Sequence, residues 1–185
     1  MGFVIFLVVV GLVVAVAIAA YNRLVGLTQR SEAAWSDVDV QLKRRTDLVP
    51  NLVETVKGYA AHERGTFDAV VRARGAAVTA AAPEARVLAE GQLSDALRQL
   101  FAVAEGYPNL KASDNFQSLQ KSLAEIEDAL QNARRSYNAV ARELNTAIDR
   151  FPSNGVASFF RFGKRTYFEP DRPEDRQPPR VSFGS

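Results

Sequence analysis

The sequence predicts an all-α protein, an elongated antiparallel bundle of about four helices preceded by one N-terminal transmembrane helix. Two patterns predict this fold. An uninterrupted apolar run occupies residues 2–20, and from Phe116 to Phe151 apolar side chains recur at alternating steps of three and four. No segment shows the alternation with a period of two that marks a half-buried strand.

The apolar run, GFVIFLVVVGLVVAVAIAA, holds no charged side chain. As a helix from Gly2 to Ala20 it is about 28 Å long, close to the ~30 Å hydrocarbon core of a bilayer. The alternative is a cleaved signal peptide, because residues 15–19 offer small-x-small cleavage patterns. A retained anchor is favoured, since no Lys or Arg precedes the run and its length exceeds that of a usual signal-peptide core.

Basic residues follow the apolar run and none precedes it: Arg23, Arg30, Lys43, Arg44 and Arg45. The positive-inside rule then places the N-terminus outside the cell and the domain in the cytoplasm. We therefore expect a single-pass protein of the cell membrane.

Apolar steps of three and four continue from Tyr21 to Leu42, so the span is expected to enter the domain as one helix. Thr46 and Asp47 precede Pro50, which predicts a helix restart at this point and a second helix from Leu48 to the stretch before Pro83. A third helix is expected over 84–104.

The segment 105–109 reads as a breaker cluster before the fourth helix. Ser113 or Asp114 can cap that helix, and Pro152 ends it. The predicted organisation is an anchor over 1–20, a helical bundle over 21–168 and a disordered, Pro-rich charged tail over 169–185.

Composition excludes several classes of function. A net charge of +2 is too balanced for the concentrated basic face of a nucleic-acid-binding protein. The chain contains no cysteine, which excludes disulfides, thiolate catalysis and zinc–thiolate sites.

Four polar residues were considered for catalysis or metal binding. On a helix Asp37 and Asp39 point about 200° apart, so they do not form a paired carboxylate site. His62 is the only histidine; with Glu63 it lacks the second histidine of the zinc-protease motif and the remaining ligands of a di-iron bundle. Neither a cofactor nor a metal is expected, and a phosphotransfer or metal-dependent enzyme is the least favoured hypothesis.

Two segments are candidate contacts for partners. The basic cluster Lys43, Arg44 and Arg45 would form a solvated face, pair between helices, or meet an acidic partner. The segment 159–168 interleaves aromatic and basic residues and would pack on the bundle as a strap, touch the membrane interface, or dock a partner. Its candidate contact residues are Phe159, Phe160, Arg161, Phe162, Lys164 and Arg165.

The sequence also resembles the LemA family. The resemblance is carried by YNRLV after the apolar run, by SEAAWSDVDVQLKRRTDLVPNLVETVKGYAAHER, by EGYPNLKASDNFQSLQKSLAEIEDALQNARRSYNAVARELNTAIDRFPS and by FRFGKRTYFE, together about residues 20–169. It implies a bacterial membrane protein with one N-terminal span, a short N-terminus outside and an elongated α-helical domain. It implies no agreed enzymatic activity, cofactor or catalytic residue.

The leading hypothesis is a non-enzymatic, membrane-anchored helical scaffold or adaptor. Its partners would be a lipid bilayer, through residues 2–20, and unidentified proteins. The alternative is an oligomeric protein that organises the membrane or envelope; the residues do not decide between a monomer and a homo-oligomer.

Overall fold

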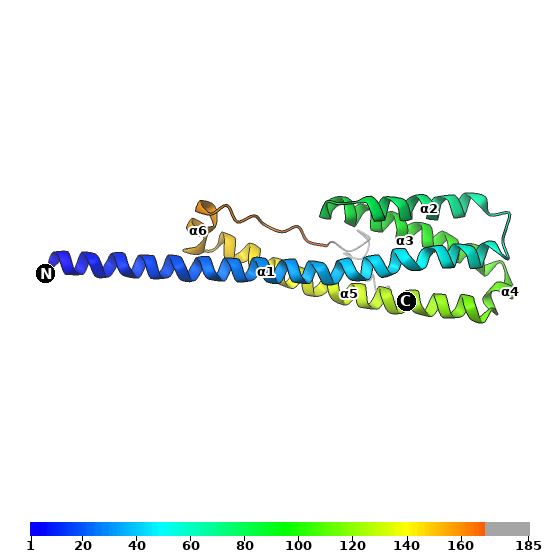
Figure 1. Cartoon of the computed structure of the whole chain (residues 1–185), viewed down its shortest axis with the longest axis horizontal. Helices are drawn as coiled ribbons and strands as arrows, with labels where there is room; N and C mark the ends of the chain where they lie inside the picture. The colour runs from blue at the N-terminus through cyan, green and yellow to red at the C-terminus, as the bar shows by residue number, and fades with distance from the viewer. Residues whose placement is uncertain (169–185) are drawn as a thin grey trace, which may run out of the picture.

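A computed structural model describes residues 1–168, apart from the side chains of residues 83 and 84. Over this range the chain is helical and contains no strand (Figure 1). The helices of this range are α1 (Gly2–Lys57), α2 (Arg64–Thr79), α3 (Pro83–Glu105), α4 (Pro108–Lys111), α5 (Asp114–Asp149) and α6 (Ser153–Phe159). The prediction of an all-α elongated bundle is confirmed, whereas the expected tail over 169–185 lies outside the described residues.

The first helix joins the apolar run to the bundle without a break. α1 has 56 residues, which corresponds to about 84 Å at ~1.5 Å per residue. Its most apolar window has a mean hydropathy of 3.2, and none of that window is buried. Burial begins at Leu24, where α1 meets the other helices. By length and composition, α1 is therefore able to cross a membrane.

The predicted restart of the helix at Asp47 is wrong. α1 continues through Pro50 to Lys57, and the chain turns only between Gly58 and Glu63. Pro50 is exposed, so its ring clashes with no neighbouring helix. The carbonyl that Pro50 leaves without a helical partner accepts a hydrogen bond from a side chain of α2. This bond replaces the donor that proline removes from the helix, which is one part of the usual cost of proline in a helix interior.

The last long helix follows its prediction closely. Ser113 caps α5, since its Oγ accepts a hydrogen bond from the backbone N–H of Phe116 at 3.5 Å. The predicted seam is buried at Phe116, Leu123, Ile126, Leu130, Tyr137, Leu144 and Ala147. Leu119, Ala133 and Val140 are half-buried, whereas Phe151 lies beyond the end of α5 and is 85% exposed.

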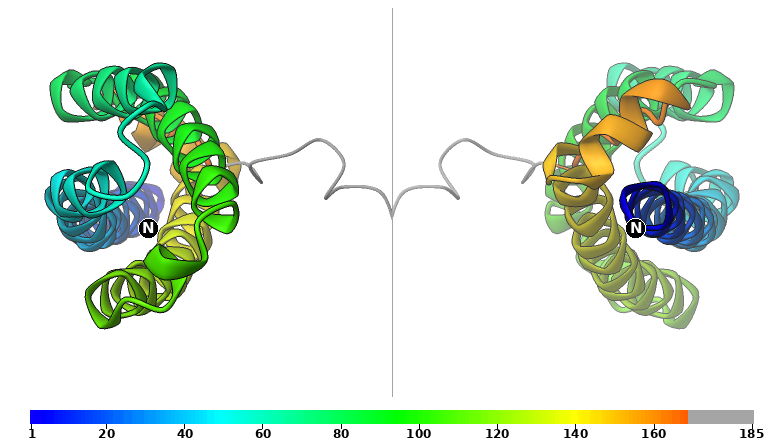
Figure 2. Two further views of the ribbon diagram at one scale, coloured as in Figure 1. Left: turned by 90° about the vertical axis from the view of Figure 1, so that its right-hand side faces the viewer. Right: turned by 90° about the vertical axis from the view of Figure 1, so that its left-hand side faces the viewer.

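Figure 1 shows α1 and α5 running antiparallel along the bundle, with α2 and α3 forming a hairpin at the end far from the N-terminus. Seen end-on, α2, α3 and α5 form an arc around one side of α1 (Figure 2). α4 joins α3 to α5, and α6 packs against both α1 and α5 near the apolar run. The short helices α4 and α6 were not predicted, because one or two turns leave little periodicity to detect.

The core consists of three apolar clusters along the rod. The distal cluster joins α2 and α3 to the last part of α1 and the start of α5. The middle cluster lies around Val38, Leu42 and Leu130, and the proximal cluster around Leu24, Leu144 and Ala157. Buried polar side chains lie between the clusters. Ser31 and Asn145 lie between the proximal and middle clusters, and Arg45 and Glu90 lie between the middle and distal clusters.

Candidate interaction site at the C-terminal strap

Residues 161–168, here called the strap, leave α6 and run back along the bundle. Arg161 adopts a left-handed backbone conformation with φ of 59°, and the N–H of Phe162 bonds to the carbonyl oxygen of Ala157 at 2.9 Å. This is the usual way of ending a helix and reversing the chain, although glycine more often takes the left-handed position. The turn directs the strap toward the middle cluster.

Two asparagines of α5 hold the backbone of the strap. Asn145 donates from Nδ2 to the carbonyl oxygen of Arg165 and accepts the N–H of the same residue on Oδ1, both at 2.8 Å. Asn138 makes the same pair of 2.8 Å bonds with Phe168. Seven helical residues span roughly 10.5 Å and three extended residues about 10 Å, so the two spacings match. The face of α5 thus binds an extended chain much as a neighbouring strand would.

An aromatic cluster anchors the end of the strap. Phe168 is 7% exposed; its ring stacks on Trp35 with 5.3 Å between centroids and an interplanar angle of 14°. The ring of Tyr137 meets Phe168 edge-on at 5.6 Å, and the guanidinium carbon of Arg134 lies 5.3 Å from the centroid of the same ring. Aromatic pairs and cation–π contacts of this kind each contribute about 0.5–1.5 kcal/mol.

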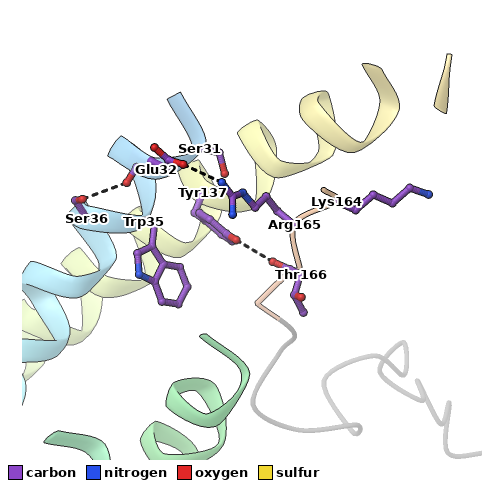
Figure 3. A pocket seen from close by; sticks show the side chains of 8 residues that line it. All are labelled: Ser31, Glu32, Trp35, Ser36, Tyr137, Lys164, Arg165 and Thr166. Atoms are coloured by element: carbon purple, nitrogen blue, oxygen red, sulfur yellow. Dashed lines mark hydrogen bonds and ion pairs between the residues drawn. The ribbon is translucent and has the colours of Figure 1, made fainter. Parts of the chain in front are cut away.

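A pocket of about 320 Å³ opens beside the strap (Figure 3). Across it, Nη2 of Arg165 lies 3.0 Å from Oε1 of Glu32, and the hydroxyl of Tyr137 donates to the carbonyl oxygen of Thr166 at 3.0 Å. The Oγ of Ser31 is buried without a hydrogen-bond partner. The full lining is Ser31, Glu32, Trp35, Ser36, Tyr137, Lys164, Arg165 and Thr166.

The candidate residues around α6 and the strap take different positions. Phe159 and Phe160 are 80% and 54% exposed, and Arg161 is exposed. Phe162 is half-buried and packs against Tyr21, with ring centroids 5.8 Å apart. The basic side chains form ion pairs at the surface: Lys164 with Asp149 at 2.8 Å and Arg165 with Glu32 at 3.0 Å.

The basic cluster of α1 does not stay together. Lys43 and Arg44 are exposed, and Nζ of Lys43 lies 2.8 Å from Oδ2 of Asp47. Arg45 is 2% exposed and lies inside the bundle. Lys43 and Arg44 are therefore accessible to a partner, whereas Arg45 pairs between helices.

Arg45 contacts three side chains, of which Glu90 is a buried charge. Its Nη1 lies 3.2 Å from Oε2 of Glu90, and its Nη2 donates to Oγ of Ser94 at 2.9 Å. Its Nε is 2.8 Å from Oε1 of Glu127, but the geometry is not that of a hydrogen bond. Burial raises the pKa of the Glu90 carboxyl above its ordinary value of 4.5, and the charge of Arg45 opposes this rise.

Glu90 was not identified from the sequence, although a signal was present. Glu90 stands three residues before Leu93 and seven before Leu97, so it occupies a core position of the α3 seam. A buried carboxylate needs a cation beside it, and Arg45 is likewise at a core position of its own helix, α1.

The residues considered for catalysis lie apart. Nη1 of Arg86 lies 2.6 Å from Oδ1 of Asp39, whereas Asp37 is exposed. His62 and Glu63 lie in the turn between α1 and α2. Among the side chains that the structure describes, no three His, Asp or Glu residues come together as metal ligands would.

Comparison with known proteins decides the family. The LemA family model matches residues 34–183, most of the chain. The chain belongs to the LemA family. The LemA match begins inside α1 at residue 34, covers the rest of the bundle and the strap, and continues beyond the resemblance noted at about residue 169.

Curated relatives of this LemA protein include magnetosome proteins. MamQ 2 and MamQ 1 of Paramagnetospirillum magneticum are each 28% identical to it, over 84% of this chain and 67% of the relative. MamQ of Magnetospirillum gryphiswaldense is 27% identical, over 80% of this chain and 64% of the relative. The chain spans about two thirds of the length of these relatives.

Proposed function

We propose that this LemA protein is a single-pass, membrane-anchored helical scaffold or adaptor without enzymatic activity. One observation carries the proposal: the apolar window of α1 contains no buried residue and belongs to the same helix that forms the bundle. A membrane contact made by residues 2–20 would therefore fix the position of the whole rod.

The exposed apolar surface supports the anchor. Phe3, Val8 and Leu12 are 74%, 66% and 66% exposed, and no residue of the most apolar window is buried. Apolar surface left in water costs about 25 cal/mol per Å², whereas a bilayer accepts it. The basic residues after Ala20 favour a cytoplasmic bundle by the positive-inside rule.

The length of α1 beyond the apolar run supports a scaffold. From Ala20 to Lys57 the helix extends about 55 Å. The bundle would therefore present Lys43 and Arg44, about 35 Å from the end of the run, well away from the lipid. Their exposed charges suit an acidic protein partner.

The strap supports adaptor function in a second way. The α1–α5 face already binds an extended segment through Asn138, Asn145 and an aromatic anchor. Capture of main-chain groups together with one buried side chain is a common mode of peptide recognition. The same face would accept an extended segment of a partner wherever the strap is displaced.

The anchor is tested by extracting membranes with alkaline carbonate. The full chain should remain in the pellet, and a variant lacking residues 2–20 should be released. Release of the full chain would overturn the membrane anchor.

The scaffold is tested by photo-crosslinking from a probe at Gln41, beside the exposed charges. A discrete adduct should form, disappear with the double substitution Lys43→Glu and Arg44→Glu, and persist with Lys121→Glu, a single charge reversal at another exposed site. Adducts unaffected by either change would argue against this surface.

A second candidate function is an oligomeric protein that organises the membrane. The observation in its favour is the set of exposed aromatic rings on and beside α6, close to the apolar run. Mass measurement in detergent and imaging of reconstituted vesicles test it. A monomer that leaves vesicle shape unchanged would remove this candidate.

A further inference from the structure

Residues 151–160, here called the foot, comprise α6 and the residues on either side of it. The foot carries the most exposed aromatic side chains of the bundle: Phe151, Phe159 and Phe160 are 85%, 80% and 54% exposed. Phe160 also contacts Tyr21 at the end of the apolar run, with 4.7 Å between ring centroids. Rings of this size left facing water mark a binding surface.

The foot lies beside the apolar run itself. A groove of about 470 Å³ is lined on one side by α1 residues between Leu12 and Ala20 and on the other by Phe151, Pro152, Gly155 and Val156. Its lining is almost entirely apolar. Figure 1 shows α6 alongside α1, at the end of the bundle from which the N-terminal part of α1 projects.

The depth of this contact follows from the helix rise. Leu12 precedes Ala20 by eight residues, so the groove extends about 12 Å along α1 into the apolar run. If residues 2–20 fill a hydrocarbon core of ~30 Å, the foot lies at the level of the leaflet nearest the bundle. Interfacial helices insert their apolar faces about 5–10 Å, a comparable depth.

Unpaired positive charge surrounds the same region. Arg23, Arg150 and Arg161 are exposed, and none of them forms an ion pair with a residue of the described chain. Each lies within three residues of the apolar run or of an aromatic residue of the foot. Long basic side chains at an apolar boundary extend toward lipid headgroups, and an anionic membrane surface attracts them.

We propose that the foot is a second membrane contact, inserted into the leaflet on the bundle side. Phe151, Phe159 and Phe160 enter the lipid, an acyl chain fills the groove against α1, and the three arginines bind anionic phospholipid headgroups. This inference rests on the proposed anchor, because the depth of the foot is defined by the span. Two contacts on one rigid body fix the tilt and rotation of the rod relative to the membrane.

The absence of cysteine allows a direct test in the full-length protein. Single-cysteine variants Val8→Cys, Ser158→Cys and Lys121→Cys, all at exposed sites, are labelled with nitrobenzoxadiazole. They are reconstituted into phosphatidylcholine vesicles with or without phosphatidylglycerol, and quenching by iodide is measured. The first position reports the span, the second the foot without removing an aromatic ring, and the third the far end of the bundle.

The expected result is several-fold weaker quenching at Val8 and Ser158 than at Lys121. Quenching at Ser158 as strong as at Lys121, with Val8 protected, would overturn the foot and leave the anchor intact. Strong quenching at Val8 would overturn the anchor itself.

Two sets of variants test the chemistry of the contact. Replacing Phe159 and Phe160 with serine should expose the label at position 158 and leave the label at position 8 protected. The pair Arg150→Gln and Arg161→Gln should remove any extra protection given by phosphatidylglycerol, whereas Arg142→Gln, on the exposed surface of α5, should not. If Arg142→Gln reduced the protection by phosphatidylglycerol as much as the pair Arg150→Gln and Arg161→Gln, the assignment of the headgroup contact would be overturned.

Discussion

Nε of Arg74 donates a hydrogen bond of 2.7 Å to the backbone carbonyl oxygen of Thr46. In a regular helix this oxygen would accept the N–H of residue 50, but that residue is Pro50 and has no N–H. A side chain of α2 thus replaces the missing backbone donor of α1. The same contact links the two helices at the point where the sequence predicted a break.

We expect Arg74→Met to destabilise the fold by about 1–3 kcal/mol, because the part-buried carbonyl loses its donor. In a Pro50→Ala background the helix supplies its own N–H, so the same substitution should cost several-fold less. Urea denaturation of the full chain in detergent, for the wild type, both single variants and the double variant, measures this coupling. Equal costs in the two backgrounds would show that Arg74 does not compensate for the proline.

The pair Arg45 and Glu90 predicts a different kind of coupling. Arg45→Met leaves a buried carboxylate without its nearest cation, which should cost about 3–5 kcal/mol. Adding Glu90→Leu should recover most of this loss, since apolar side chains can replace a buried ion pair without penalty. Equilibrium unfolding checks both values.

Lys43→Met is the matched control for the buried pair, because the ion pair of Lys43 with Asp47 lies at the surface. It should change stability by no more than about 1 kcal/mol. Similar costs for Lys43→Met and Arg45→Met would contradict the distinction between the two sites.

The raised pKa of Glu90 predicts a dependence of stability on pH. Between its ordinary value of 4.5 and the higher folded-state pKa, the folded chain keeps a proton that the unfolded chain has lost. The contribution of this group to stability is therefore largest below the unfolded-state pKa and falls as the pH rises through the folded-state pKa. Glu90→Gln removes this dependence, so the variant should gain stability relative to the wild type as the pH rises through this window.

Denaturation curves of the wild type and of Glu90→Gln across the acid to neutral range measure this difference. Glu125→Gln, at an exposed position of α5, serves as the control and should parallel the wild type. A stability difference between Glu90→Gln and the wild type that does not vary with pH would contradict the assignment.

Local periodicity was sufficient to predict much of this fold. The seam from Phe116 to Ala147 and the continuity of α1 from the apolar run both follow from steps of three and four. The same rule would have placed Arg45 in the core, three residues after Leu42 and four before Val49. Adjacency in the sequence groups Arg45 with Lys43 and Arg44, whereas helical periodicity places it on the opposite, buried side of α1.

Other features depend on contacts that no local pattern encodes. The path of the strap is set by Asn138 and Asn145. In the sequence these are ordinary polar residues of a helix, and their amides form hydrogen bonds to the strap only because an extended chain lies beside α5. Phe151 fits the spacing of the seam, yet the helix ends before it and leaves it exposed. Periodicity identifies a face of a helix but does not identify what covers it.

The paired asparagine bonds predict that the strap can be released without unfolding the bundle. The double substitution Asn138→Ala and Asn145→Ala removes five hydrogen bonds to the strap, four to its backbone and one to the hydroxyl of Tyr167, and each such bond contributes about 0.5–1.5 kcal/mol. Phe168 should then leave Trp35, which is the only tryptophan of the chain and stacks on that ring. Tryptophan emission should shift to longer wavelength, and trypsin should cleave after Lys164 several-fold faster. The control is Asn132→Ala, at an exposed site of the same helix, which should change neither signal. Unchanged emission in the double variant would show that the aromatic contacts alone hold the strap.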